Sequence, residues 1–165
     1  EMVGIALEVK PRIVTLVPEK REELTTEGGL DIVGQQESIH ATTQRLQKAG
    51  IKVSLFVEAD LAQLKASSEV GADTVELHTG TYCDADATTQ PYELQRLTKA
   101  AQDAHALGLE VVAGHGLHLK NVGSIAAIPE IVELNIGHAL IAHASFVGLQ
   151  QAVAEMAACM RSHRK

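Results

Sequence analysis

Five acidic and imidazole side chains stand where short β-branched segments of the chain end, and these residue types can move protons. They are Glu19, Glu76, His78, His115 and His138. Carboxylates and imidazoles serve as general acids and bases. The sequence therefore predicts an acid–base site, provided that one fold brings the ends of these segments together.

Two segments combine glycine with histidine. In Gly114-His115-Gly116 the glycines let the backbone approach a ligand closely while the imidazole points at it. We therefore expect His115 to act as a general acid or base, the alternative being a histidine that only caps a turn. In the second segment Gly137 exposes backbone amides where a helix should begin at His138, which is the arrangement of an anion site.

Two carboxylates of expected strands are interpreted differently. Glu76 lies between Val75 and Leu77 and runs into a His-Thr-Gly turn, so it could stabilise a developing positive charge or move protons. The alternative is a structural hydrogen-bond anchor. Glu133 lies nearer the start of its segment, where we expect an inward carboxylate in a structural ion-pair network.

A long loop at 17–30 carries charges, hydroxyls and a glycine pair. Loops of this kind are often lids or ligand loops, although a solvated connector has the same composition. We interpret the remaining histidines of the helices and connectors as solvated: His40, His105, His118 and His163. Neither Cys83 nor Cys159 nor any histidine pair has convincing metal spacing, so no metal is expected.

Five β-branched segments alternate with stretches of helical period, which indicates βα units around a parallel sheet. The expected strands are 13–17, 53–57, 74–78, 110–114 and 131–136. Apolar and polar side chains alternate along them, whereas the strands of an open doubly wound sheet are covered on both faces and read as continuous apolar runs. The pattern therefore favours a (β/α)8 barrel with a functional interior, whose site lies at the C-terminal strand ends.

Helix boundaries are expected at several points. A first helix over 2–9 should stop at Lys10-Pro11, and Asp60 with Gln63 should form a capping box. Another helix should begin near Pro91 and end at Gly108. For the last helix we expect one face packed on the sheet, formed by Phe146, Leu149, Val153, Met156 and Met160.

The chain opens on a helix, whereas βα architectures open on a strand, and it carries five of the eight strands of a closed barrel. Its 165 residues also fall short of the roughly 250 of such barrels. We therefore expect residues 1–165 to be a single domain, the C-terminal two-thirds of a (β/α)8 barrel whose first βα units are absent.

The composition of the chain limits the classes of partner that it can be expected to bind. The net charge of −7 and the aromatic content of 2% argue against a nucleic-acid surface. No apolar run approaches the roughly 18 to 20 residues of a membrane span, and two distant cysteines favour a reducing, cytoplasmic compartment. We expect small molecules or copies of the same chain as partners.

Six motifs stand in one order along the whole chain. They are Val-Pro-Glu-Lys-Arg with Thr-Thr-Glu-Gly-Gly-Leu-Asp, Val-Ser-Leu-Phe-Val, Glu-Leu-His-Thr-Gly, Ala-Gly-His-Gly-Leu, and Glu-Leu-Asn-Ile-Gly-His-Ala-Leu. In this order they resemble the pyridoxine 5′-phosphate synthase family. The resemblance implies a (β/α)8 barrel that condenses 3-amino-2-oxopropyl phosphate with 1-deoxy-D-xylulose 5-phosphate, giving pyridoxine 5′-phosphate, inorganic phosphate and water. It implies no metal or organic cofactor, and a homo-oligomer, commonly an octamer.

The resemblance also implies roles for single residues. His115 would be the proton donor and Glu76 the residue that stabilises a transition state. Thr25 would contact the sugar phosphate substrate. The remaining implied contacts, to the aminoketone phosphate or the product, are Gly116, Gly137 and His138.

Three departures from the family pattern concern its first strands, whose Asn-x-Asp-His, His-Leu-Arg and Leu-Glu-Met motifs are not in this chain. Those motifs supply both proton acceptors of the family. The alternative function is therefore a truncated, catalytically incomplete barrel fragment that binds phosphorylated ligands. A further departure is His143, where the family commonly has arginine, which leaves less positive charge near the second glycine–histidine motif.

Overall fold

One parallel sheet organises the protein. The computed structural model describes residues 1–18 and 28–164. Within them the strands lie in the order β1-β2-β3-β4-β5. Their bounds are β1 Ile13–Leu16, β2 Lys52–Val57, β3 Thr74–His78, β4 Glu110–Gly114 and β5 Ile131–Asn135. A doubly wound sheet reverses its strand order at a switch point, so this consecutive order excludes it, confirms the α/β class and agrees with part of a (β/α)8 barrel.

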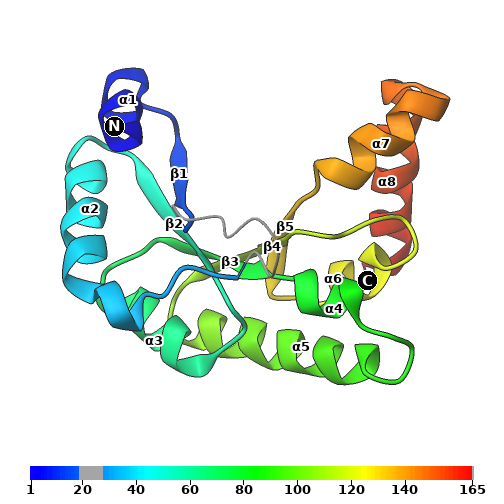
Figure 1. The fold of residues 1–165 in the computed structure, drawn as a ribbon, viewed down its shortest axis with the longest axis horizontal. Coiled ribbons are helices and arrows are strands. Elements are labelled where there is room, and N and C mark those ends of the chain that lie inside the picture. The colour runs from blue at the N-terminus through cyan, green and yellow to red at the C-terminus, as the bar shows by residue number, and fades with distance from the viewer. Residues whose placement is uncertain (19–27, 165) are drawn as a thin grey trace.

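Helices connect the strands. They are α1 Met2–Val9, α2 Gln36–Lys48, α3 Leu61–Glu69, α4 Gly80–Asp84, α5 Gln90–Ala106, α6 Val122–Ala126, α7 His138–Val147 and α8 Leu149–His163, with a 3-10 turn η1 at Val33–Gln35. Figure 1 shows α1 at the β1 end of the sheet and α7 and α8 at the β5 end, with α3 and α5 running beneath the strands. Among the described residues, no helix is long and apolar enough to cross a membrane.

The expected helix signals act largely as the sequence indicates. The carboxylate of Asp60 caps α3 by accepting from the backbone N–H groups of Ala62 and Gln63, at 2.9 and 3.1 Å. The other half of the expected capping box is wrong. The side-chain oxygen of Gln63 instead accepts from the N–H of Ile32 at 2.7 Å, because η1 lies next to the start of α3.

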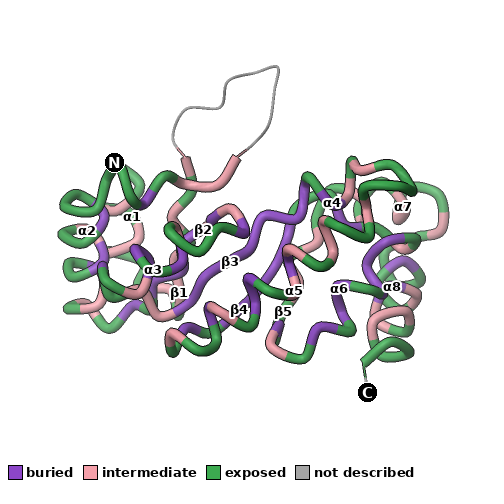
Figure 2. Tube along the Cα trace, turned by 90° about the horizontal axis from the view of Figure 1, so that it is seen from below, coloured by how far each residue is buried: buried purple, intermediate pink, exposed green. Residues whose placement is uncertain are grey.

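The apolar faces of the strands form the core with the helices. Val53, Leu55, Val75 and Leu77 are fully buried, and Leu97 of α5 packs in the same cluster. Burying one such side chain stabilises a fold by roughly 1.5–3 kcal/mol. In Figure 2 the buried stretches run along β3 and its neighbours, so the core follows the middle of the sheet.

The expectation for the last helix is wrong. The chain breaks at Gly148, where φ is 86°, into α7 and α8. Phe146 is 89% exposed, whereas Met156 is buried, so these two residues do not share one covered face. The helix α8 packs on α6 and α7. The close approach to α6 depends on Gly123, because a β-carbon there would stand 2.6 Å from Nε2 of His163.

Candidate active site

Strand register places the polar side chains in two rows across the sheet. Glu76 pairs with Val112 and Val112 with Glu133, while His78 pairs with Gly114 and Gly114 with Asn135. Residues at the same level of adjacent strands point to the same face. Glu133 therefore lies level with Glu76, so two carboxylates are on one face of the sheet. This position of Glu133 differs from the expected one nearer the start of its strand.

Glu76 is buried in the middle of this face. Burial raises the pKa of Glu76, with a further contribution from the charge of Glu133, and these outweigh the hydrogen bond with Asn135 and the charge of His115, which lower it. The neighbouring Gly114 leaves room for the carboxylate, because a β-carbon at position 114 would lie 2.6 Å from Oε1 of Glu76. Glu76 is thus a carboxyl group that holds its proton more tightly than usual.

His115 follows β4 in a backbone conformation that side chains rarely adopt. Its φ is 84°, and Gly116 follows with a φ of 75°. A residue other than glycine costs roughly 1–2 kcal/mol in this region. The buried hydroxyl of Thr79 donates to the carbonyl of Gly114 at 2.7 Å and also to that of His115, so it holds the turn from below.

A second buried group supports the other side of the turn. The side-chain oxygen of Asn121 accepts from the N–H of His118 at 2.7 Å, and its amide donates to the carbonyl of Gly116 at 3.4 Å. The hydroxyl of Tyr82 donates to the backbone carbonyl of Asn121 at 2.9 Å. The strained turn is therefore fixed by contacts from the residues before and after it in the chain.

The thiol of Cys83 closes the turn from α4. A β-carbon on Gly116 would stand 2.8 Å from the Cys83 β-carbon, so only glycine fits beneath the histidine turn. Burial raises the pKa of Cys83 to about 11. The group is therefore a protonated thiol at neutral pH, which suits packing more than nucleophilic chemistry.

His78 lies between His115 and the end of β2. Its ring centroid is 5.0 Å from that of His115 and 5.2 Å from that of Phe56. Its Nδ1 is 2.6 Å from Oε1 of Glu58. The structure thus brings together three of the predicted residues, Glu76, His78 and His115, at the C-terminal ends of β3 and β4.

The predicted anion site lies at the next strand end. Gly137 is the N-cap of α7 and His138 its first residue, and both are exposed. Unpaired backbone N–H groups at a helix start attract anions. His143, on the second turn of the same helix, has its Nε2 2.7 Å from Oε2 of Glu155 on α8. This hydrogen bond links α7 to α8 one turn beyond the exposed N-terminus of α7.

Roles for Thr79, Asn121 and Glu58 were not predicted from the sequence. For Glu58 a signal existed, since it follows β2 in the polar alternation. Thr79 and Asn121 carry no periodic signal, because their function depends on a turn remote in sequence. Glu19 and Thr25 lie outside the described residues. Within the described ranges, no group of three or more His, Cys, Asp or Glu side chains is placed to hold a metal ion.

Comparison with known proteins extends over the whole chain. The family model for the pyridoxal phosphate biosynthesis protein PdxJ matches residues 1–162. Pyridoxine 5′-phosphate synthases of Photobacterium profundum and Aliivibrio fischeri are 58% and 57% identical to all of this chain. A synthase of a Synechococcus species is 57% identical over 99% of it.

The chain spans 68% of the length of the first two relatives and 66% of the third. It also resembles the crystal structure of the Amycolatopsis orientalis BexX/CysO complex, with a TM-score of 0.61 and 18% identity, over 97% of this chain and 60% of that one. At 18% identity, the likeness to the BexX/CysO complex shows a similar fold and nothing more.

Proposed function

The chain belongs to the PdxJ family of pyridoxal phosphate biosynthesis proteins, the pyridoxine 5′-phosphate synthases, and on this premise we propose which of its residues perform the chemistry. The reaction condenses 3-amino-2-oxopropyl phosphate with 1-deoxy-D-xylulose 5-phosphate and yields pyridoxine 5′-phosphate, inorganic phosphate and water. The main support for this proposal is that Glu76, His78 and His115 lie together at two adjacent strand ends, next to the exposed start of α7.

His115 is the proton donor of this proposal. Its backbone lies in the left-handed region, and the hydroxyl of Thr79 donates to the carbonyl groups on both sides of its Cα. A general acid must meet its acceptor within hydrogen-bond reach, so a fixed ring lowers the cost of reaching that geometry. The strain at position 115 is retained where a proton must be delivered along one direction.

Glu76 stabilises the cationic character that develops when an amine and a carbonyl carbon condense. Its position on the polar face, with Gly114 beside it, leaves the carboxyl group facing the space above the sheet. Burial raises the pKa of Glu76, so its carboxylate takes up a proton more readily than an ordinary one and can exchange that proton with an intermediate.

The phosphate group of the aminoketone, or of the product, is held at the two glycine-bearing turns. Gly116 and Gly137 present backbone N–H groups, and His138 lies at the start of α7, where the helix dipole favours an anion. Thr25 contacts the sugar phosphate in the same proposal.

Several properties follow from the same assignment. Residues 1–165 form a single barrel domain, for which the one continuous sheet and shared core are the support. The protein works in the cytoplasm as a homo-oligomer, with phosphorylated small molecules as partners and without a metal, a nucleic acid or a membrane. Inorganic phosphate leaves as a product.

The test is a reaction with both substrates of the purified protein, expressed together with any natural coding sequence upstream of residue 1, in which phosphate release and the absorbance of pyridoxine 5′-phosphate are followed together. We expect the two products to form in equal amounts, and only when both substrates are present. A folded protein that binds either substrate and forms no pyridoxine 5′-phosphate would favour the phosphate-ligand-binding alternative and contradict the assignment.

A further inference from the structure

The ring of His78 is held by the carboxylate of Glu58, which has further partners of its own. Oε1 of Glu58 lies 2.6 Å from Nδ1 of His78 and also accepts from the backbone N–H of Gly29 at 3.2 Å. Oε2 lies 3.9 Å from Nη1 of Arg96, whose Nη1 also donates to the carbonyl of Ala59 at 3.3 Å. Glu58 therefore has partners from three segments of the chain, which leave its carboxylate little freedom to rotate.

The ionisation of Glu58 agrees with this geometry. Burial raises its pKa, but the hydrogen bond and charge of His78, the N–H of Gly29 and the charge of Arg96 together hold it below its ordinary value. An ionised carboxylate only accepts hydrogen bonds. The proton of the short contact therefore belongs to Nδ1 of His78, and Nε2 is the ring atom that remains available on the other side.

That second nitrogen lies beside His115. Nε2 of His78 is buried and, in the described part of the chain, has no hydrogen-bond partner. A β-carbon on Gly80 would stand 2.5 Å from this nitrogen and 3.2 Å from Cδ2 of His115, so both rings border the same point above Gly80. Leaving a buried polar atom unpaired costs roughly 1–3 kcal/mol, and such an atom in a folded protein calls for an explanation.

We propose that His78, oriented by Glu58, is a positioning residue that sets the orientation and proton affinity of the His115 imidazole. The inference rests on the proposed function for its role in the reaction, but the contact between the two rings stands on geometry alone. Phe56 supports the arrangement from β2, since its ring meets that of His78 edge to face at 64°. Glu58, His78 and His115 thus form a chain that runs from the end of β2 to the proton donor.

Other charged groups also face this pair of rings, and the experiment must separate them from His78. Glu76 lies two residues before His78 on the same face of β3, and Glu133 lies level with Glu76 on β5. Cys83 on α4 contacts the carbonyl of His115 at 3.5 Å. Arg96 on α5 acts on the pair through Glu58. Glu76, Glu133 and Cys83 are unchanged when only position 58 or 78 is replaced, whereas the effect of Arg96 is altered together with Glu58.

The test follows the ring signals of His115 by NMR in histidine-labelled protein across a pH series, with His115→Asn used to assign them. His78→Phe keeps a ring of similar shape and removes both nitrogens. Glu58→Gln keeps the side-chain length at a position that is 35% exposed and removes the charge. His105→Phe, on the exposed side of α5, is the matched control.

We expect Glu58→Gln to lower the pH at which the His115 ring gains its proton by at least about half a unit, because a negative charge near the pair is lost. His78→Phe should also move the signals and their midpoint, and His105→Phe should not. If His78→Phe does not fold, Glu58→Gln decides alone. Signals of His115 that titrate as in the wild type in folded Glu58→Gln protein would overturn the proposal.

A kinetic measurement then links the positioning to the reaction. His78→Asn keeps an N–H donor for Glu58 but lacks the ring edge beside His115, so we expect kcat to fall by about ten- to a hundredfold, with little change in KM. Because the NMR signals need no substrate, shifted His115 signals in a protein without synthase activity would refute the proposed function and leave the positioning role intact.

Discussion

The carboxylate of Glu76 lies against Gly114 so closely that a β-carbon at position 114 would stand 2.6 Å from its Oε1 and 2.9 Å from the backbone oxygen of Asn135. The absence of a side chain at Gly114 of β4 therefore leaves room for the Glu76 carboxylate of β3 beside Asn135 of β5. This packing makes the glycine–histidine motif a structural requirement as well as a chemical one.

Gly114→Ala should destabilise the protein by about 1–3 kcal/mol, because the added methyl group meets backbone and the Glu76 carboxylate, neither of which can move freely. The measurement is the free energy of unfolding in urea. Gly4→Ala is the control, since nothing lies within 4 Å of a β-carbon at position 4 of α1. Equal stability of the two variants would show that the sheet yields at Gly114.

Glu76 should make the stability of the protein fall as the pH rises. Burial raises its pKa above the ordinary value of 4.5, so the folded state binds the Glu76 proton more tightly than the unfolded state. The resulting stabilisation is complete below the unfolded pKa and is lost as the pH rises through the folded pKa. Glu76→Gln has no such proton.

The difference in unfolding free energy between Glu76→Gln and the wild type should therefore move in favour of the variant as the pH rises above the ordinary pKa of 4.5. Chemical denaturation at several pH values measures it. Parallel pH profiles of the two proteins would mean that Glu76 titrates as an ordinary surface carboxylate.

Thr79→Val should cost about 0.5–1.5 kcal/mol of stability, because it removes the hydroxyl that donates to the carbonyl groups of Gly114 and His115. The carbonyl of Gly114 keeps the backbone N–H of Thr79 as a donor. Thr79→Ser should keep most of the stability, since the hydroxyl remains. Thr98→Val is the control, because the Thr98 hydroxyl donates to the carbonyl of Leu94 within its own helix. Thermal unfolding compares the three, and similar losses at positions 79 and 98 would argue against a clamp on the histidine turn.

Because the backbone at position 115 is left-handed, replacing His115 by glycine should relieve backbone strain while removing the imidazole needed for activity. His115→Gly should be more stable than His115→Ala by about 1 kcal/mol, because glycine adopts a φ of 84° without the steric penalty of a β-carbon. Urea unfolding of both variants provides the comparison, with neither retaining the imidazole. If alanine proves equally stable, position 115 carries no backbone strain in solution.

The strands were predictable because their side chains alternate with a period of two. The expected strands 74–78 and 110–114 have the observed bounds of β3 and β4. In the last helix, Gly148 ends α7 although the apolar spacing continues into α8. The short helices α4 and α6 have five residues each, which is too few for a helical period to show in the sequence.

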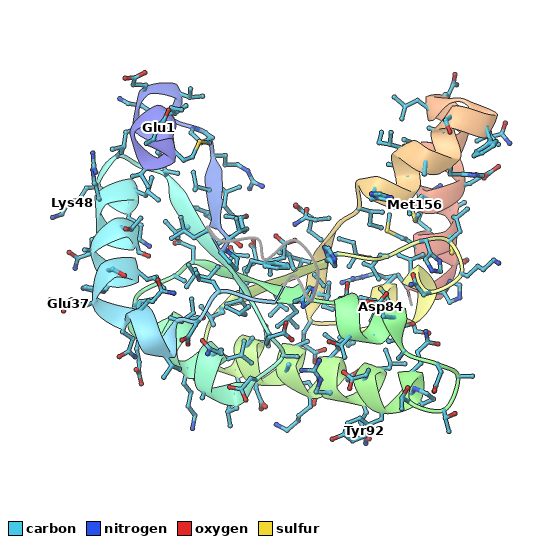
Figure 3. The ribbon with its side chains drawn as sticks, in the orientation of Figure 1. Glu1, Glu37, Lys48, Asp84, Tyr92 and Met156 are labelled. Atoms are coloured by element: carbon cyan, nitrogen blue, oxygen red, sulfur yellow. The ribbon has the colours of Figure 1, made fainter. Side chains whose placement is uncertain are left out.

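The candidate site was predictable as a set of residues but not as a set of contacts. Glu76, His78 and His115 follow from strand ends, since parallel strands place those ends at one edge. The pairing of His78 with Glu58 depends on the register of two strands whose residues are 20 positions apart. An aromatic residue in the sequence does not by itself indicate a functional site. Tyr92 of α5, for example, is exposed and points away from the sheet (Figure 3).

The most direct test of the central claim is the rate of pyridoxine 5′-phosphate formation by His115→Asn, measured beside the wild type and the exposed control His105→Asn. We expect the His115 variant to lose about 10²- to 10⁴-fold in kcat, the usual contribution of a positioned proton donor, while His105→Asn retains the wild-type rate. A folded His115→Asn protein that forms the product as fast as the wild type would contradict the account.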